Sequence, residues 1–362
     1  MPKKESLPSA VYRGRLAAIA RSESPSVEKT KEVTSLFRTR ITEMLGIKYP
    51  ILEGGMVRVG TGELAAAVAN TGCFGMISSH DYPSRELLKA EIKKARSLTD
   101  KPFGINVGFW PTISTLDRGE LIDTALEEGI KVIETSGHIV EDDVKRIRKG
   151  KVIHIHKVAR LRDARSAERL GVDAVTIVGY ECGGGSPMEE ITTMIQVPQV
   201  VDAVKIPVLA GGGIGDARGF VAALSLGASG VVMGTRFMMT RDSMVHQSIK
   251  EKLVKAEAAD TVLIQRSIRV GERVVKNERA EKILAMEQRG AKLEELLPFL
   301  VGGEIARRAW DEGNFDTLVP CGQVIGLIND IPTVKEVVDN IVKGAQEIIK
   351  GLSSLAAADK RK

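Results

Sequence analysis

The chain has 362 residues, of which 43% are hydrophobic and 27% are charged, a balance typical of a soluble protein with one large domain and an accessory region. No apolar run approaches the ~18 residues of a membrane span and the N-terminus lacks a signal-peptide pattern, so we expect a cytoplasmic protein. A net charge of +5 with only 4% aromatic residues argues against nucleic-acid binding, and three widely spaced cysteines argue against a disulfide framework.

Residues 1–40 mix charged residues, serine and proline with short apolar runs, which predicts an N-terminal extension outside the main core. Over residues 41–257, eight short apolar runs each precede a segment with helical periodicity. These runs are YPILEG, GMISS, FGINVGF, KVIETSG, KVIHIHKV, DAVTIVGYE, PVLAGGG and GVVMGT. Eight βα units are the number that closes a TIM barrel, so we predict an α/β fold with a TIM (β/α)8 barrel over 41–257. A doubly wound open sheet is the alternative, because the sequence does not show closure.

The βα alternation lapses after residue 257. Residues 258–330 contain a strand-like stretch, TVLIQRSIRVGERVV, followed by helical and turn-rich segments, which predicts a smaller C-terminal accessory or lid domain near the barrel mouth. For residues 331–362 we predict an amphipathic helix over 333–352 that packs back on the barrel, and then a frayed tail.

In a TIM barrel the active site lies where the strands end, so the segments that follow the apolar runs are the candidates for chemistry. The seventh and eighth runs lead into AGGGIGDARG and VMGTRF. Bare glycine amides before helices form phosphate cradles, and the loops after strands seven and eight are where this fold usually places them. The alternative is that these glycines only make tight turns.

Several motifs resemble one known family when they are taken in order. They are YPILEGGM, TGELAAAVANTGCFGMI, KPFGIN, KVIETSG, IHKVA, ECGGG, PQVVDAVKIPVLAGGGIGDARG and GASGVVMGTRF, and the likeness resumes at CGQVIGLINDIPTV. Together they resemble the FMN-dependent nitronate monooxygenases, once called 2-nitropropane dioxygenases, which are related to flavin-dependent enoyl reductases. The likeness covers most of the chain.

The resemblance implies a barrel that holds FMN. The residues that it places at the phosphate are Gly212, Gly213, Gly234 and Thr235, and those near the isoalloxazine are Gly55, Met56, Asn106 and Lys157. Met233 is a further expected cofactor-binding residue. Met56 would lie against a ring face, Asn106 would hydrogen-bond the ring edge, and Lys157 would stabilise negative charge on the ring. The alternatives are a salt bridge at the barrel rim for Lys157 and a turn or cap for Asn106.

The stretch GYECGGGSPMEE ends the sixth run, and its Gly183 and Gly184 are expected to let the flavin approach the backbone. The family usually has a proton-transferring histidine where this chain has Gly185, and a flavin-contacting amide where it has Val178. The resemblance therefore supports the cofactor and leaves the proton-transfer step without its usual group.

Two residues are the candidates for that missing group. His138 ends the fourth run, and a neutral imidazole suits proton transfer, although a surface histidine is the alternative. Cys182 is a candidate nucleophile or redox thiol, with a small packed cysteine as the alternative. Tyr180, Glu181 and His80 are further options. The histidines are too scattered to predict a metal site, so none is expected.

The function predicted on this basis is oxidation of a nitronate to a carbonyl compound and nitrite by an FMN-dependent oxidoreductase. One alternative is an NAD(P)H-dependent reductase of an enoyl thioester or another activated alkene, and another is a flavin-binding protein without turnover. The expected partners are a small-molecule substrate, with NAD(P)H and O2 as further reactants, and neither nucleic acid nor a membrane. The sequence is also compatible with a homodimer.

Overall fold

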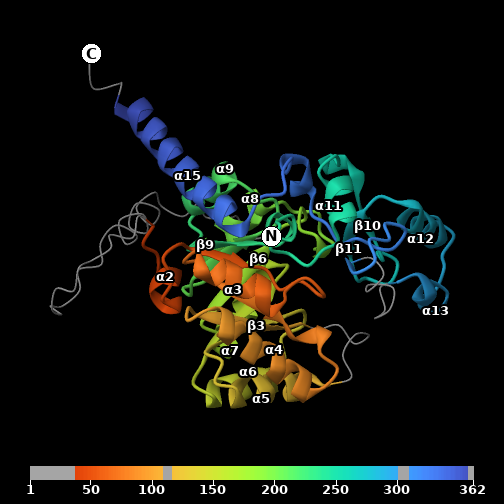
Figure 1. Cartoon of the computed structure of the whole chain (residues 1–362), viewed down its shortest axis with the longest axis horizontal. Coiled ribbons are helices and arrows are strands. Elements are labelled where there is room, and N and C mark those ends of the chain that lie inside the picture. Colours follow the sequence, from red (N-terminus) through yellow and green to blue (C-terminus); the bar gives the residue numbers. More distant parts are fainter. Residues whose placement is uncertain (1–36, 109–115, 301–309, 358–362) are drawn as a thin grey trace, which may run out of the picture.

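The computed structural model describes residues 37–108, 116–300 and 310–357, so most of the predicted N-terminal extension lies outside the described residues. All eight apolar runs form strands of one sheet (Figure 1). The strands are β1 (Ile51–Glu53), β2 (Gly75–Ser78), β3 (Phe103–Val107), β4 (Val132–Ser136), β5 (Ile153–Val158), β6 (Ala174–Val178), β8 (Val208–Gly211) and β9 (Gly230–Met233).

The eight strands pair in parallel in the order β1-β9-β8-β6-β5-β4-β3-β2. The two outermost strands, β1 and β2, meet at a parallel bridge between Leu52 and Phe74. Next to this bridge the Glu53 carboxyl accepts a hydrogen bond from the Met76 N–H at 3.0 Å, so a side chain extends the backbone ladder. The sheet therefore closes on itself, and the predicted TIM barrel is confirmed over the open sheet.

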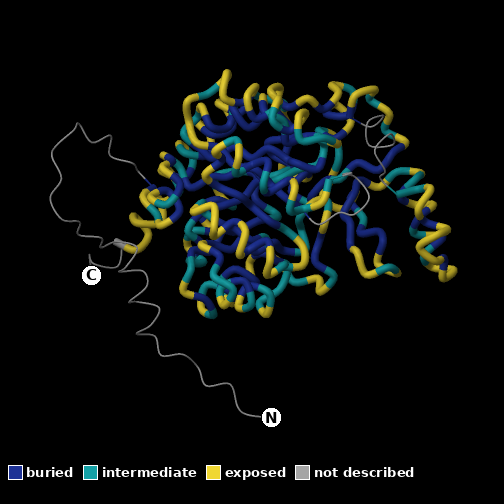
Figure 2. The backbone as a smooth tube through the Cα atoms, turned by 90° about the horizontal axis from the view of Figure 1, so that it is seen from below, coloured by how far each residue is buried: buried dark blue, intermediate teal, exposed yellow. Residues whose placement is uncertain are grey.

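Helices surround the barrel, so that the buried strands lie at the centre of the molecule (Figure 2). Threonine, serine or aspartate caps begin several of them: Thr61, Ser84 and Asp117 each accept a hydrogen bond from a backbone N–H in the first turn. The helices that follow the barrel strands are α3 (Gly62–Asn70), α4 (Arg85–Leu98), α5 (Arg118–Glu127), α6 (Glu141–Lys149), α7 (Leu161–Leu170), α8 (Thr193–Ala203), α9 (Ala217–Ser225), α10 (Thr235–Met238) and α11 (Gln247–Leu253).

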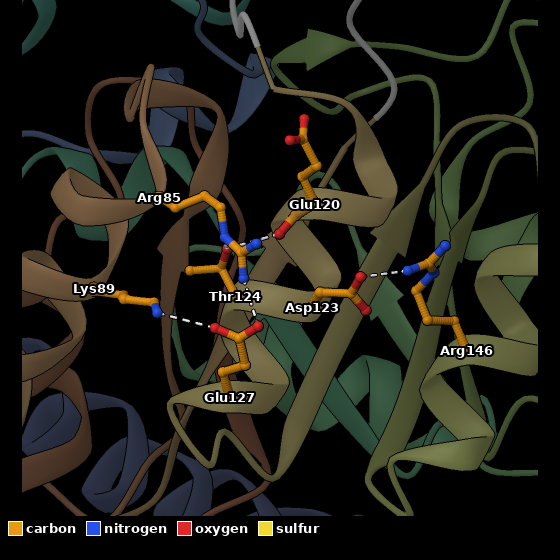
Figure 3. A network of polar contacts seen from close by, with 7 residues as sticks. All are labelled: Arg85, Lys89, Glu120, Asp123, Thr124, Glu127 and Arg146. Carbon is orange, nitrogen blue, oxygen red and sulfur yellow. Dashed lines mark hydrogen bonds and ion pairs between the residues drawn. The ribbon is translucent and has the colours of Figure 1, made fainter.

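Polar contacts join the outer helices α4, α5 and α6 (Figure 3). Arg85 of α4 donates to the Thr124 hydroxyl at 3.0 Å, and Lys89 donates to the Glu127 carboxylate at 2.9 Å. Arg146 of α6 pairs with Asp123 of α5. Thr124 is buried, but the charged side chains are only partly buried, so each ion pair contributes little to stability.

The barrel interior changes from apolar to polar along the strands. At the N-terminal ends of the strands the filling is apolar, and Ile41 and Leu45 of α2 (Arg40–Leu45) pack into it. The strand residues in this layer are Leu52, Phe74, Met76, Val132, Ile155, Ala174, Leu209 and Val232. Two residues further along β4, β5 and β6 the same inward positions hold Glu134, Lys157 and Thr176. The polar end is the end at which the predicted site lies.

The strand-like stretch predicted in the accessory region forms a hairpin. Its strands β10 (Thr261–Ile264) and β11 (Glu272–Val275) pair antiparallel. A third strand, β7 (Gly184–Gly185), comes from the loop after β6 and pairs with β11, which the sequence did not predict. The helices α12 (Glu278–Gln288) and α13 (Leu293–Leu296) share a small separate core with this sheet. The domain boundaries at 258 and 330 stay a prediction.

The last helix, α15 (Val334–Ala357), packs on α9 through apolar residues that include Val337, Val338 and Ile341. The helix continues past residue 352, so the predicted frayed tail was wrong for Leu355–Ala357, which are helical. This C-terminal part extends beyond the barrel (Figure 1).

Candidate active site

Three side chains from adjacent strands meet inside the polar end of the barrel. Asn106 of β3 donates through Nδ2 to Glu134 Oε2 at 2.6 Å, and Lys157 of β5 places Nζ 3.1 Å from the same oxygen. Glu134 of β4 is only 2% exposed, and the Thr176 hydroxyl of β6 is 3.4 Å from its other oxygen. The carboxylate therefore fixes both residues that the sequence places near an isoalloxazine.

The loop after β1 closes over this group of side chains. A Cβ on Gly55 would lie 2.6 Å from Asn106 Oδ1, so only glycine allows the loop to lie this close. The Met56 side chain lies beside Gly234, because a Cβ there would be 3.5 Å from the Met56 sulfur. The structure thus brings together Gly55, Met56, Asn106 and Lys157, as predicted, and joins them to the end of β9.

The loops after β8 and β9 present backbone donors. Gly212 and Gly213 have φ values of +89° and +73°, which favour glycine. Within the described parts of the chain, the N–H groups of Gly213, Gly234 and Thr235 have no hydrogen-bond acceptor. Free backbone N–H groups that converge beside a hydroxyl are the donors that a phosphate needs.

Thr235 is held by a segment far away in the sequence. Its Oγ1 accepts a hydrogen bond from the Gly322 N–H at 3.0 Å, and the same hydroxyl interacts with the Cys321 thiol. Gln323 N–H also donates to the Glu181 carbonyl at 2.9 Å. The stretch CGQVIGLINDIPTV carries part of the family resemblance, but its sequence does not predict that it lies beside the predicted phosphate site.

The glycines after β6 have structural roles that the sequence did not show. A Cβ on Gly183 would lie 2.6 Å from the Gly322 nitrogen, so the close approach observed there is to the backbone of Cys321 and Gly322. Gly184 has a φ of +67° and pairs with Arg273 of β11. Contact of Gly183 and Gly184 with the flavin stays a prediction.

Gly185 pairs with Glu272 of β11, and a Cβ at this position would meet nothing within 4 Å. The absence of a side chain at Gly185 is therefore not imposed by packing. Val178, where the family has an amide, is buried and packs near Gly211.

Three residues are predicted to be catalytic: Lys157, which pairs with Glu134, and His138 and Cys182, which lie at the rim and in the loop after β6. His138 is exposed on the loop after β4. The Cys182 sulfur lies 3.5 Å from the Gly185 carbonyl oxygen, and burial raises the pKa of this thiol to about 11. The thiol is protonated at neutral pH, which does not favour a nucleophilic role. All three assignments stay predictions.

The other polar candidates have partners within the protein. Glu181 accepts hydrogen bonds from the N–H and hydroxyl of Thr193, and the Tyr180 ring lies under the Arg273 guanidinium at 4.3 Å. On the outer side of the barrel, His154 and His156 each lie 2.7 Å from the Thr135 hydroxyl. His80 is buried at the barrel mouth beside Gly108.

Residues 37–108, 116–300 and 310–357 hold no group of three or more His, Cys, Asp or Glu side chains placed to bind a metal ion. None of their helices is both long and apolar enough to cross a membrane.

These residues fit FMN. The free N–H groups at Gly213, Gly234 and Thr235 suit its phosphate, and Met56 lies between them and the group at Asn106, Glu134 and Lys157. A charged amine and an amide fixed at the polar end of the barrel suit the polar edge of an isoalloxazine.

Comparisons with known proteins agree with this fit. The family model described as nitronate monooxygenase matches residues 38–344. A (3aS,4S,5R,7aS)-5-hydroxy-7a-methyl-1-oxo-octahydro-1H-indene-4-carboxyl-CoA dehydrogenase from Rhodococcus jostii is 30% identical over 89% of this chain and 100% of its own length. A probable nitronate monooxygenase from Staphylococcus aureus is 32% identical over 62% of this chain and 75% of its own length.

Among solved structures, FabK from Thermotoga maritima superposes with a TM-score of 0.82 and is 37% identical, over 88% of this chain and 99% of FabK. The family model spans the barrel, the accessory hairpin and the segment around Gly322. The chain therefore belongs to the nitronate monooxygenase family, whose members are FMN-dependent oxidoreductases.

Proposed function

We propose that this protein is an FMN-dependent oxidoreductase of an acyl thioester, working on the two carbons next to the thioester carbonyl. The observation that carries the proposal is the full-length match to a carboxyl-CoA dehydrogenase, which covers 100% of that protein. The residues of this chain that follow the barrel are part of the site, because Gly322 holds Thr235 and Gly183 packs against Gly322. A relative that matches over this whole arrangement is a better guide to the substrate than one that matches 62% of the chain.

FMN, when bound, exchanges a hydride with the substrate. The chain's own residues bind and orient. Thr235 and the free N–H groups beside it hold the phosphate, while Asn106 and Lys157, both fixed by Glu134, hold the polar ring edge. Gly185 adds no side chain to the loop after β6, and a Cβ at this position would meet nothing within 4 Å.

Nitronate oxidation, the function predicted from the sequence, is the second candidate. The observation that favours it is the loop after β6, where Gly185 cannot transfer a proton. A nitronate is already deprotonated, so its oxidation needs no strong base, whereas oxidation of the neutral nitroalkane does. This candidate predicts faster reaction with the nitronate than with the neutral form of the same nitroalkane.

An anaerobic titration of the FMN-loaded protein separates these candidates. The flavin absorbance is followed as a saturated acyl-CoA, a nitronate, NADH or NADPH is added. Bleaching by the saturated acyl-CoA, with recovery on addition of the enoyl-CoA, supports the thioester proposal. Bleaching by NADH or NADPH followed by recovery with the enoyl-CoA also supports thioester chemistry, in the reductive direction. Bleaching by the nitronate alone selects the second candidate, and no bleaching by any of these compounds supports a flavin-binding protein without turnover.

A further inference from the structure

His80 is a buried histidine at the barrel mouth. It lies in a 3-10 turn, η1 (Ser79–Asp81), directly after β2, and it is only 5% exposed. The Gly108 backbone interacts with its ring, but among the described residues neither Nδ1 nor Nε2 makes a hydrogen bond of normal geometry. Buried polar side chains nearly always have a partner, so this ring has hydrogen-bonding capacity that a bound ligand can use.

The imidazole points to the interior side of the barrel mouth. Asn106 faces the interior from β3, and Gly108, two residues further along, continues that face. A Cβ on Gly108 would lie 2.9 Å from His80 Nε2 and 3.2 Å from the Ser136 hydroxyl oxygen. The turn itself is fixed to β3, because the Ser79 hydroxyl donates to the Asn106 carbonyl at 2.8 Å. His80 therefore reaches over the strand that carries a predicted flavin ligand.

The charged groups around His80 favour a neutral ring. Arg118 of α5 donates to the carbonyls of Gly108 and Ser136, at 3.2 Å each, and pairs with Asp143 at 2.7 Å. Burial lowers the pKa of His80 and the positive charge of Arg118 acts in the same direction, while the interaction with the Gly108 backbone partly opposes both. The neighbouring Asp81 accepts the Arg58 N–H at 2.5 Å, and burial raises the pKa of its carboxyl to about 7. A neutral imidazole can accept a proton at one nitrogen.

We infer that His80 is the catalytic acid–base group of this site, in place of a side chain at Gly185. The inference rests on the proposed function. In oxidation of the thioester, the Cα–H bond breaks and its proton goes to an imidazole nitrogen of His80, while the Cβ–H bond breaks and its hydride goes to FMN. The two electrons of the Cα–H bond form the Cα=Cβ double bond. In reduction the same proton returns from His80 to Cα.

The test compares His80→Gln with His246→Gln, which removes an exposed histidine at the start of α11 instead. The first measurement is exchange of the Cα proton of bound acyl-CoA with D2O, followed by mass spectrometry. We expect His80→Gln to slow this exchange by about 100-fold or more, and His246→Gln to leave it within about twofold, in line with the usual contribution of a general base. Added imidazole should partly restore exchange in His80→Ala. Exchange in His80→Gln within a few-fold of wild type would overturn the inference.

Further measurements distinguish loss of the acid–base group from misfolding of the variant and from a wrong choice of substrate. Equal FMN affinity and thermal midpoint in wild type and His80→Gln show that the variant folds and binds cofactor. If the protein acts on nitroalkanes instead of thioesters, the proposed function fails. The inference then requires that His80→Gln slows oxidation of the neutral nitroalkane but not oxidation of the nitronate. Equal effects on both forms would contradict it. If the protein acts on neither, ¹⁵N-histidine NMR decides: His80 ring signals that do not move when an acyl-CoA or a nitroalkane is added reject the inference.

Discussion

Asn106 and Lys157 donate to the same oxygen of Glu134, at 2.6 and 3.1 Å, inside the polar end of the barrel. The amide and the amine come from β3 and β5, and the carboxylate comes from the strand between them. Because Glu134 is almost fully buried, this geometry is held without competition from water. Both predicted ring-binding residues are therefore pre-positioned by one acid.

Replacing this acid should weaken FMN binding. Glu134→Ala removes the partner of both donors and leaves Lys157 without its counter-charge, so we expect the FMN dissociation constant to rise by about tenfold, or ~1.4 kcal/mol. Fluorescence titration of FMN measures it. Glu141→Ala removes an exposed carboxylate of α6 and serves as the control. An unchanged FMN affinity in Glu134→Ala would refute this role.

Two glycine-to-alanine variants compare a position where packing requires glycine with a position where it does not. A Cβ at Gly55 would collide with the Asn106 side chain, whereas a Cβ at Gly185 would meet open space. We therefore expect Gly55→Ala to lose most FMN binding and Gly185→Ala to bind FMN as wild type does. The ratio of flavin to protein after purification and gel filtration is the measurement, and similar ratios for both variants would count against the geometry at Gly55.

The hydroxyl of Thr235 should contribute to phosphate binding. Thr235→Val keeps the shape of the side chain but removes the donor, and it also leaves the Gly322 N–H without its acceptor. We expect about a tenfold weaker FMN affinity, since hydrogen bonds to charged groups contribute about 1.5–3 kcal/mol. Thr235→Ser restores the hydroxyl and should recover most of the affinity. Equal affinities of the valine and serine variants would exclude this role.

Glu272 should make the protein less stable as the pH rises. Burial raises the pKa of its carboxyl from an ordinary 4.5 to about 7. Between these values the folded protein holds a proton that the unfolded chain has released, so the free energy of unfolding falls with rising pH and levels off above about 7. The loss is at most about 3 kcal/mol.

Urea unfolding from pH 4.5 to 8 measures this dependence. Glu272→Gln should remove the contribution of Glu272 and flatten the slope, while Glu294→Gln, at an exposed position of α13, should leave the slope unchanged. A Glu272→Gln protein with the wild-type slope would show that another group titrates.

Cys182 should be dispensable for turnover. Because burial raises the pKa of its thiol to about 11, almost no thiolate exists at neutral pH. We expect Cys182→Ser to keep at least about half of the wild-type kcat, whichever substrate the protein uses. A loss of about 100-fold with normal FMN content would instead make Cys182 part of the chemistry.

The eight strands and the glycine loops after β8 and β9 could be predicted from the sequence because each depends on local patterns, whereas the FMN residues are implied by the family resemblance and stay a prediction. Short apolar runs such as AVTIV precede helical periods, and glycines such as Gly212 and Gly213 follow directly after strands. The partners could not be predicted, because they depend on contacts between distant parts of the chain. Gly322 reaches Thr235 across 87 positions, and β7 pairs with a hairpin that follows the barrel.

Glu134 and His80 left weaker signals that the sequence analysis did not use fully. Glu134 interrupts the apolar run KVIETSG, and an acid inside a buried strand requires a partner. His80 follows the second run, but only the structure shows that its ring is buried and makes no hydrogen bond of normal geometry with the described residues. Burial and hydrogen-bond satisfaction follow from the packed fold and not from the order of residues.

The most direct test of the central claim is the anaerobic titration of the FMN-loaded protein with a saturated acyl-CoA. The account predicts that the flavin absorbance is bleached in proportion to the thioester added and recovers when the matching enoyl-CoA is supplied. The proposed thioester chemistry would be contradicted if a nitronate bleaches the bound FMN and the acyl-CoA does not. This holds provided that the enoyl-CoA also fails to restore the flavin absorbance after reduction by NADH or NADPH. A protein that stays colourless and cannot be loaded with FMN would contradict the whole account.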